Sequence, residues 1–238
     1  MPKIPSLVEM LEAGVHFGHQ PSKWHPKMKP YIFGVRNNVH IIDVEKTAEK
    51  LKEVSVFIND AISKGKVILF LGTKKQIQDK IKKEAERCGC PYINQRWLGG
   101  FLTNFSVIFR MIRKYKDLVR KRETGELAKY TKKEQIGFEK EIKKLEEFIG
   151  GVLGLEKMPD ILFVWDIKKE ATAIREASKM KVPIIGICDT NTNPSVIDVV
   201  IPANDDATKT IDLILPYIAD CVIEAKKASE LKREAVKK

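Results

Sequence analysis

The sequence predicts an α/β fold: a three-layer sandwich with a five-stranded parallel sheet, plus an inserted antiparallel coiled-coil helical hairpin. Three observations lead to this prediction. Short apolar runs recur along the chain, amphipathic segments separate them, and one long basic stretch with helical periodicity interrupts the alternation. No complete nucleotide-binding or catalytic motif accompanies the pattern, which indicates a protein that works by binding.

Five apolar runs are predicted to form buried parallel strands, because both faces of each run are apolar and β-branched residues are frequent. They are VILFLG at 67–72, PYIN at 91–94, ILFVWD at 161–166, IIGICD at 184–189 and VVIP at 199–202. Amphipathic helices are expected over residues 46–64, 74–88, 168–180 and 207–226. The alternation of strands and helices favours right-handed crossovers around one sheet.

The interruption is predicted to be a helical hairpin. Apolar residues recur at spacings of three and four on both arms: Ile108, Met111, Tyr115 and Leu118, then Phe138, Ile142, Leu145, Ile149 and Val152. A loop around residues 125–133 joins the arms, each of about 19 residues and roughly 28 Å. Gly150, Gly151 and Gly154 indicate a flexible return joint.

These elements divide the chain into five parts. We expect an N-terminal extension with a short helix and an RNA-facing irregular segment at 1–40, and a charged tail, expected to be disordered, at 227–238. Between them lie the first part of the α/β domain at 41–105, the hairpin at 106–154 and the second part of the domain at 155–226.

Charge is distributed unevenly along the chain, whose formal net charge is +11. Residues 1–150 carry 30 basic and 18 acidic side chains, whereas residues 159–225 carry 6 and 11. Such asymmetry suggests a polyanionic partner, most simply nucleic acid, although plain solubility is the alternative. The absence of a signal sequence and of a long apolar run excludes exported and membrane-spanning classes, and the four cysteines fit a reducing cytosol.

Three basic regions are the predicted RNA-binding sites. An irregular N-terminal segment places Trp24 among prolines and lysines, which suits base stacking and phosphate contact. RWLGGFLTNF at 96–105 combines arginine, aromatics and adjacent glycines, and is also a candidate hinge for the hairpin. Arginines on the hairpin suit contact with RNA or protein, although a solvated charged face is the ordinary alternative. With Lys74 and Lys75, which follow the first predicted strand, added to these regions, the candidate residues are Lys23, Trp24, His25, Lys27, Lys29, Arg36, Lys74, Lys75, Arg96, Arg110, Arg113, Lys114, Lys116, Arg120 and Lys121.

The turn after the first predicted strand partly resembles a phosphate-binding loop. Gly72, Thr73 and Lys74 lead into a helix, but the single glycine satisfies neither the Walker nor the dinucleotide pattern. Lys74 and Lys75 could hold one backbone phosphate of a nucleic acid. A sugar-phosphate or nucleotide-using enzyme, with its substrate near Gly72 and Asp189, is the rival hypothesis, and a scaffold whose hairpin binds protein is the third.

Polar residues at the ends of the last two predicted strands allow a metal site. His19, Asp189 and Asp205 could hold a structural divalent cation, although no cofactor is required by the sequence. Helix capping by Asp205 or Asp206 is the favoured alternative. Cys88 and Cys90 form a C-x-C, which could bind metal or simply be two semi-buried residues at a helix end.

Four ordered blocks make the sequence resemble the bacterial small-subunit ribosomal protein S2 family. They are MLEAGVHFGHQPSKWHPKMKPYIFG, RWLGGFLTNF, PDILFVWDIKKEATAIREASKMKVPIIGICDTNTNP and IPANDDATKTIDL, and together they cover most of the chain. The resemblance implies a five-stranded parallel α/β domain with an inserted coiled-coil hairpin. It also implies a non-enzymatic, cytoplasmic, ribosome-associated protein that binds small-subunit rRNA and neighbouring ribosomal proteins and helps recruit ribosomal protein S1, with no membrane partner and no homo-oligomer.

Overall fold

A five-stranded parallel sheet lies at the centre of the molecule, as the sequence predicts. The computed structural model describes residues 2–237, with side chains described for residues 2–231. The strands are β3 (Ile68–Leu71), β4 (Tyr92–Ile93), β5 (Ile161–Val164), β6 (Ile184–Cys188) and β7 (Val199–Pro202), in the order β4-β3-β5-β6-β7. All pairings are parallel. Nearly every strand side chain is buried, which explains why the strands read as continuous apolar runs.

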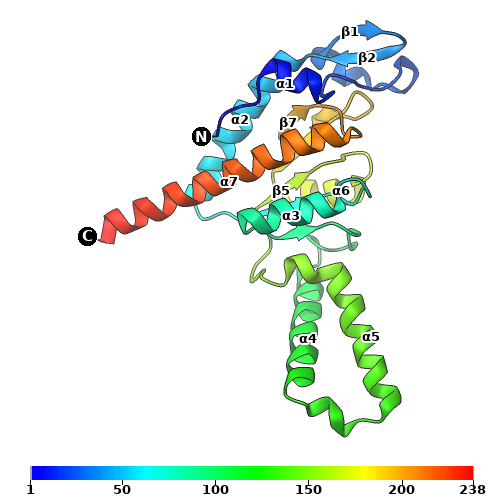
Figure 1. The fold of residues 1–238 in the computed structure, drawn as a ribbon, viewed down its shortest axis with the longest axis vertical. Helices are drawn as coiled ribbons and strands as arrows, with labels where there is room; N and C mark the ends of the chain where they lie inside the picture. The colour runs from blue at the N-terminus through cyan, green and yellow to red at the C-terminus, as the bar shows by residue number, and fades with distance from the viewer. Residues whose placement is uncertain (1, 238) are drawn as a thin grey trace.

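Helices cover both faces of this sheet and complete the three layers (Figure 1). On one face, α2 (Val44–Ser63), α3 (Gln78–Cys88) and α7 (Thr208–Lys237) bury a core that includes Phe70, Phe163 and Trp165. On the other face, α6 (Ala171–Met180) and the base of the hairpin pack on Leu69, Leu162 and their neighbours. Alternate residues of each strand therefore serve two separate cores.

Side-chain hydrogen bonds and backbone conformation explain where α2 begins and where α3 ends. Asp43 caps α2 by accepting hydrogen bonds from the amides of Glu45 and Lys46. Helix α3 begins later than predicted, because residues 74–77 form a turn, and it ends at Gly89 with φ of 62°. Helix α7 continues to Lys237, so the tail predicted from residue 227 extends this helix instead of forming a separate disordered segment.

The inserted hairpin consists of α4 (Phe105–Glu123) and α5 (Lys132–Ile149), joined through the short 3-10 helix η3 (Glu126–Lys129). The two helices run antiparallel and project from the sheet domain (Figure 1). Ile108, Ile112 and Leu118 are buried on α4, and Ile142 and Ile149 are buried on α5. Thr131 and Glu134 form a capping box at the start of α5, which explains where the second arm begins.

The N-terminal extension contains more regular structure than predicted. After α1 (Leu7–Glu12) come two 3-10 helices, η1 (Pro21–Lys23) and η2 (Pro26–Tyr31), and then an antiparallel pair, β1 (Ile32–Arg36) and β2 (Val39–Ile42). Asn37 and Asn38 connect the pair with φ of 49° and 58°. Two central residues with positive φ are typical of a tight hairpin turn, and Asn tolerates this conformation. The prediction that the extension at 1–40 is irregular is therefore wrong for residues 32–40, which lie in this strand pair.

The return from the hairpin packs tightly on the edge of the sheet. After α5, the 3-10 helix η4 (Gly150–Val152) lies against β4, and a Cβ atom on Gly151 would meet the carbonyl oxygen of Tyr92 at 2.3 Å. A Cβ on Gly154 would meet open space. The glycine-rich joint is therefore a close-packed contact at Gly151 and an open one at Gly154.

We expect Gly151→Ala to lower the free energy of unfolding by about 2 kcal/mol, because a side chain forced against backbone must displace η4 or β4. Gly154→Ala is the matched control and should leave stability unchanged or slightly raised. Urea unfolding followed by circular dichroism measures both. Equal stability of the two variants would contradict the close packing of Gly151.

Candidate nucleic-acid interface

The basic N-terminal segment is held against the loop that follows β6. Thr190 in this loop accepts hydrogen bonds from the amide of His25 at its carbonyl (2.8 Å) and from the amide of His19 at Oγ1 (2.8 Å). A Cβ on Gly18 would lie 2.5 Å from the Thr190 side chain, so the two segments are in close contact. Backbone hydrogen bonds thus fix the segment on the body of the protein.

The candidate residues of this segment differ in accessibility. Lys23, Lys27, Lys29 and Arg36 are exposed, as an electrostatic contact with phosphate requires. Trp24 is half-buried and packs on His40 with ring centroids 5.1 Å apart, and His25 Nδ1 accepts a hydrogen bond from the Lys27 amide. The two ring residues therefore shape the segment, and the four exposed cations are its accessible charges.

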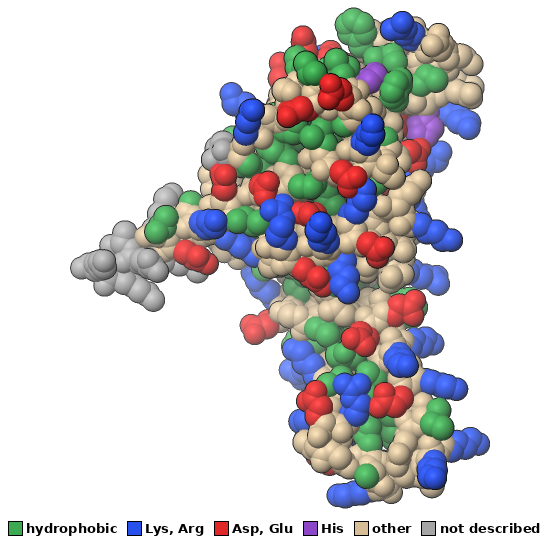
Figure 2. Space-filling model, in the orientation of Figure 1, with side chains coloured by type: hydrophobic (Ala, Val, Ile, Leu, Met, Phe, Trp, Pro, Cys, Tyr) green, Lys and Arg blue, Asp and Glu red, His purple; other side chains and the backbone are tan. Residues whose placement is uncertain are grey.

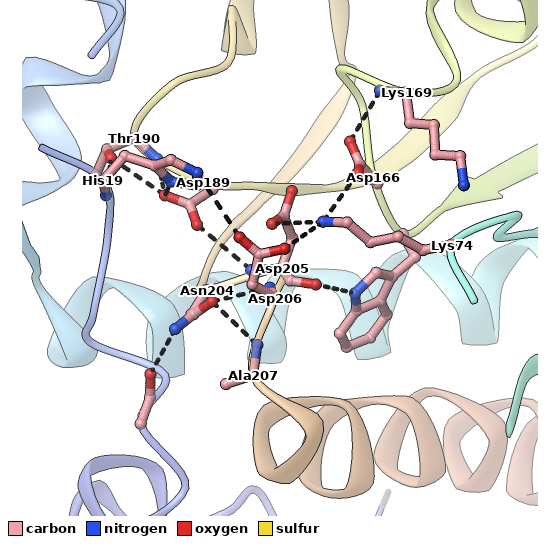
Figure 3. A network of polar contacts seen from close by, with 12 residues as sticks. His19, Lys74, Asp166, Lys169, Asp189, Thr190, Asn204, Asp205, Asp206 and Ala207 are labelled. Carbon is pink, nitrogen blue, oxygen red and sulfur yellow. Dashed lines mark hydrogen bonds and ion pairs between the residues drawn. The ribbon is translucent and has the colours of Figure 1, made fainter. Parts of the chain in front are cut away.

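Lys74 lies in a cluster of carboxylates at the ends of the strands (Figure 3). Its Nζ atom is 3.0 Å from Asp166, 3.0 Å from Asp205 and 2.7 Å from Asp206. Although burial lowers the pKa of Lys74, hydrogen bonds and charges from these aspartates raise it overall. The prediction that Lys74 contacts RNA finds no support in this position, whereas Lys75, the next residue, is exposed.

The cluster also includes Asp189 and His19. Asp205 is buried, and its pKa is raised to about 7 by burial and by the charges of Asp166 and Asp189. His19 Nδ1 lies 3.1 Å from Asp189, and this contact raises the pKa of His19 even though burial opposes it. The ammonium group of Lys74 thus provides positive charge beside the buried carboxylates, and the ring of His19 lies against Asp189.

The same region contains the residues predicted to bind a metal ion and those predicted to cap the last helix. Asp189 and Asp205 do lie together, as Figure 3 shows, and Asp189 contacts His19. Within residues 2–231, however, no group of three or more His, Cys, Asp and Glu side chains is arranged to hold a metal ion. At the start of α7, Asn204 accepts hydrogen bonds from the amides of Asp206 and Ala207, so the capping prediction for the aspartates themselves is wrong.

Glu176 connects the base of the hairpin to the sheet domain. This α6 carboxylate is 9% exposed and accepts hydrogen bonds from Trp97 Nε1 (3.1 Å) and from the amides of Gly100 (2.8 Å), Leu102 (3.0 Å) and Thr103 (3.3 Å). Burial raises the pKa of Glu176, but these hydrogen bonds lower it overall. Nothing in the sequence pattern singled out Glu176, which lies more than 70 residues from the loop that it holds.

A row of aromatic rings continues from this base along α4. Trp97 packs on Phe101, Phe101 on Phe105 and Phe105 on Phe109, and the guanidinium of Arg113 lies 4.6 Å from the Phe109 ring centroid. Such cation–π contacts stabilise the arginine without neutralising its charge. The row of aromatic rings therefore stabilises the charged side chain of Arg113 on the exposed surface of α4.

Some of the predicted hairpin cations are already paired. Lys114 contacts Glu141, Arg120 contacts Asp117 and Glu126, and Lys121 contacts Asp117. Across the described side chains, Arg110, Arg113 and Lys116 have no carboxylate within 4 Å and are the accessible charges of this arm. Arg96 is exposed at the base. Figure 2 shows Lys and Arg side chains along one long edge of the molecule, from the upper end to the hairpin.

We expect Lys74→Ala to lower the free energy of unfolding by about 3 kcal/mol, because three aspartates lose their nearby ammonium group. Lys75→Ala, the matched control, should change stability by less than about 0.5 kcal/mol, since this lysine is exposed. Denaturant titration compares the two variants. Similar losses in both would contradict the structural role of Lys74.

We expect Glu176→Gln to increase amide hydrogen exchange at Gly100, Leu102 and Thr103, because an amide oxygen is a weaker acceptor than a carboxylate and one acceptor is lost. In the wild type, the same protection should be present above the ordinary pKa of 4.5 and should fall as the pH drops through the lowered pKa of Glu176. Glu147→Gln, on the exposed surface of α5, is the control. Unchanged exchange at the three amides would contradict this role.

Comparison with known proteins gives a consistent result over most of the chain. Residues 10–225 match the family described as Ribosomal protein S2. The chain is 49% identical over 227 residues to small ribosomal subunit protein uS2 of Coprothermobacter proteolyticus, covering 95% of this chain and 85% of that protein. It is likewise 49% identical to uS2 of Geotalea uraniireducens, covering 95% and 89%. The chain therefore belongs to the ribosomal protein S2 family.

Proposed function

We propose that this protein is a structural constituent of the small ribosomal subunit that binds small-subunit rRNA and neighbouring ribosomal proteins, including S1. Membership of a ribosomal protein family makes it a structural component of the translation apparatus and not an enzyme. The observation that carries the proposal is the set of exposed lysines and arginines that the N-terminal segment and α4 carry on a braced fold. No helix in the described part of the chain is long and apolar enough to cross a membrane.

Binding to rRNA is supported by how the accessible charges are held. Lys23, Lys27 and Lys29 lie on a segment fixed by Thr190, and Arg110, Arg113 and Lys116 lie on an arm anchored through Glu176. Charges on a rigid surface lose little conformational entropy on binding, so they favour one orientation on the RNA. Such phosphate contacts position a protein, while the shape of the RNA supplies specificity.

Recruitment of S1 is supported by an apolar surface at the opposite end from the hairpin tip. Around α1 and β1, Leu11, Phe17, Phe33 and Val35 are 46%, 49%, 81% and 55% exposed, and a cavity of about 660 Å³ lies among them. Hydrophobic side chains gather at this end in Figure 2. Exposed apolar clusters of this kind are typical of protein-binding sites, and none of these residues is needed for the basic edge.

We expect the double variant Arg110→Ala, Arg113→Ala to weaken binding to small subunits that lack this protein by roughly tenfold at moderate salt, and to reduce the slope of log affinity against log salt by about 1.5. The lost phosphate contacts are the physical reason. Co-sedimentation across a salt series measures both quantities. The double variant Lys52→Ala, Lys64→Ala, at α2 and its C-cap, removes the same charge away from the hairpin and should bind like the wild type. Equal affinity of the two double variants would contradict the proposal.

We expect Phe33→Ala to abolish or strongly reduce capture of S1 by reconstituted subunits, because an exposed aromatic ring supplies much of the apolar contact area. Incorporation of the variant into the subunit should be unchanged. Val56→Ala, which removes an exposed apolar side chain from α2, is the control. Quantitative immunoblotting of S1 after sedimentation gives the result, and full S1 occupancy with Phe33→Ala would exclude this surface as its docking site.

A further inference from the structure

The segment around α6 concentrates positive charge in the acidic half of the chain. Residues 159–225 carry 6 basic and 11 acidic side chains, yet five of those six cations lie within residues 168–181. The only acidic residues of the same segment are Glu170 and Glu176, and both are buried. The charges that this segment exposes to solvent are therefore all positive.

Both carboxylates of the segment are bound to groups elsewhere in the fold. Glu170 accepts hydrogen bonds from the amide (3.1 Å) and the hydroxyl of Thr73, and Glu176 accepts those of the loop before α4. Lys169 Nζ donates a hydrogen bond to the carbonyl oxygen of Thr73 (2.7 Å). The other four cations of the segment take no part in these contacts.

These four cations lie on the outer side of α6 (Ala171–Met180). Arg175 and Lys179 are exposed on one side of the helix, four residues apart. Lys168 precedes the helix and Lys181 is its C-cap, and both are also exposed. Across residues 2–231, no carboxylate oxygen lies within 4.0 Å of the charged groups of these four residues. They form the α6 cationic face.

Arg175 is held in place without being neutralised. Its Nε atom donates a hydrogen bond to the carbonyl oxygen of Ala171 (3.2 Å), and its Nη2 atom donates one to Thr172 Oγ1 (3.4 Å). Both acceptors are uncharged, so the guanidinium keeps its positive charge, and these two bonds use only part of its N–H donors. A guanidinium fixed in this way suits contact with phosphate oxygens.

Helix stability does not explain the α6 cationic face. Cations stabilise the C-terminal end of a helix, where Lys179 lies, but they are unfavourable at the N-terminal end, which Lys168 precedes. Lys181 adopts φ of 56°, a left-handed conformation that glycine adopts with less strain. The face therefore costs stability at two positions, which indicates a role in binding.

Helix α6 lies between the two basic regions that carry the proposed function. Met28 of the N-terminal segment, Ala173 of α6 and Ile108 of α4 belong to one buried core on the same face of the sheet. Along the long axis of the molecule, α6 lies between the β1–β2 pair and the hairpin (Figure 1). A polyanion that contacts both regions on this side of the sheet would therefore pass α6.

We propose that the α6 cationic face is a further phosphate-binding surface, where Arg175, Lys179 and Lys181 contact the sugar–phosphate backbone of small-subunit rRNA. This inference rests on the proposed function, which supplies the RNA. The exposed hydroxyl groups of Thr172 and Ser178 lie among the cations and can donate hydrogen bonds to phosphate oxygens. Residues 168–181 include no aromatic side chain for base stacking, so this contact positions the protein without reading bases.

The experiment measures co-sedimentation of the full-length protein with small subunits that lack it, across a salt series. The triple variant Arg175→Gln, Lys179→Gln, Lys181→Gly should bind at least about tenfold more weakly at moderate salt, because three phosphate contacts are lost. The slope of log affinity against log salt should fall by about 2.

The matched control removes the same charge from the other face of the sheet. Lys52→Gln, Lys83→Gln, Lys209→Gln replaces exposed lysines of α2, α3 and α7 and should bind like the wild type. Circular dichroism checks that both triple variants are folded.

The single variant Lys181→Gly separates binding from folding. Glycine adopts the left-handed conformation of residue 181 without strain, so the variant should unfold at the same temperature as the wild type or at a higher one. Its affinity for the depleted subunits should nevertheless fall by roughly threefold at moderate salt. Weaker binding by an equally stable protein cannot come from damage to α6.

Two results would overturn the proposal. The first is equal affinity of the α6 triple variant and its control. The second is weaker binding with an unchanged salt slope, because the face would then contact protein and not phosphate. If the wild type itself failed to bind, the proposed function would fail as well. If the wild type bound, Arg110→Ala, Arg113→Ala bound weakly and the α6 variant bound fully, only this inference would be rejected.

Discussion

The position of the hairpin depends on one buried carboxylate. Glu176 accepts hydrogen bonds from the Trp97 ring and from three backbone amides of the loop that leads into α4. A loop at this place must leave the sheet and reverse direction, so its amides have no strand or helix partners, and buried amides without partners cost about 1–3 kcal/mol each. By satisfying these donors from α6, the carboxylate fixes the angle at which two projecting helices leave the body. The cations on the arm acquire defined positions through that angle.

A second polar cluster holds the basic N-terminal segment in place, at the opposite end of the molecule from the hairpin. Lys74 joins aspartates from the ends of β5 and β7, His19 contacts Asp189 after β6, and Thr190 holds the basic N-terminal segment by its backbone. In both centres, a charged side chain in a buried position pairs with groups that lie outside the helices and strands. Glu176 pairs with amides of the loop before α4, and Lys74 pairs with aspartates after β5 and β7. The accessible lysines and arginines lie outside these centres. Charges that hold the fold and charges available to RNA are thus separate sets of residues.

The sequence predicted the elements whose patterns are local. Buried strands such as 161–166 have a distinctive apolar composition, and the arms of the hairpin have a regular helical spacing, so both were predictable. The β1–β2 pair was missed, because Asn37-Asn38 is a weaker turn signal than Asn-Gly and the surrounding prolines suggested irregular chain. Lys74 looked like a phosphate ligand because its carboxylate partners are more than 90 residues away in the sequence. Glu176 had no signal at all, since its role depends on which loop the fold brings to α6.

The claim that most needs direct measurement is that the basic edge is formed before the protein meets RNA. Spin labels attached at residue 122 on the hairpin and residue 64 at the end of α2, in the free protein, allow the distance between the two bodies to be measured by double electron–electron resonance. A narrow distance distribution, unchanged in the assembled subunit and broadened by Glu176→Gln, is the result that this account predicts. A broad distribution in the free wild-type protein that narrows only on the subunit would contradict it, because the RNA would then impose the geometry.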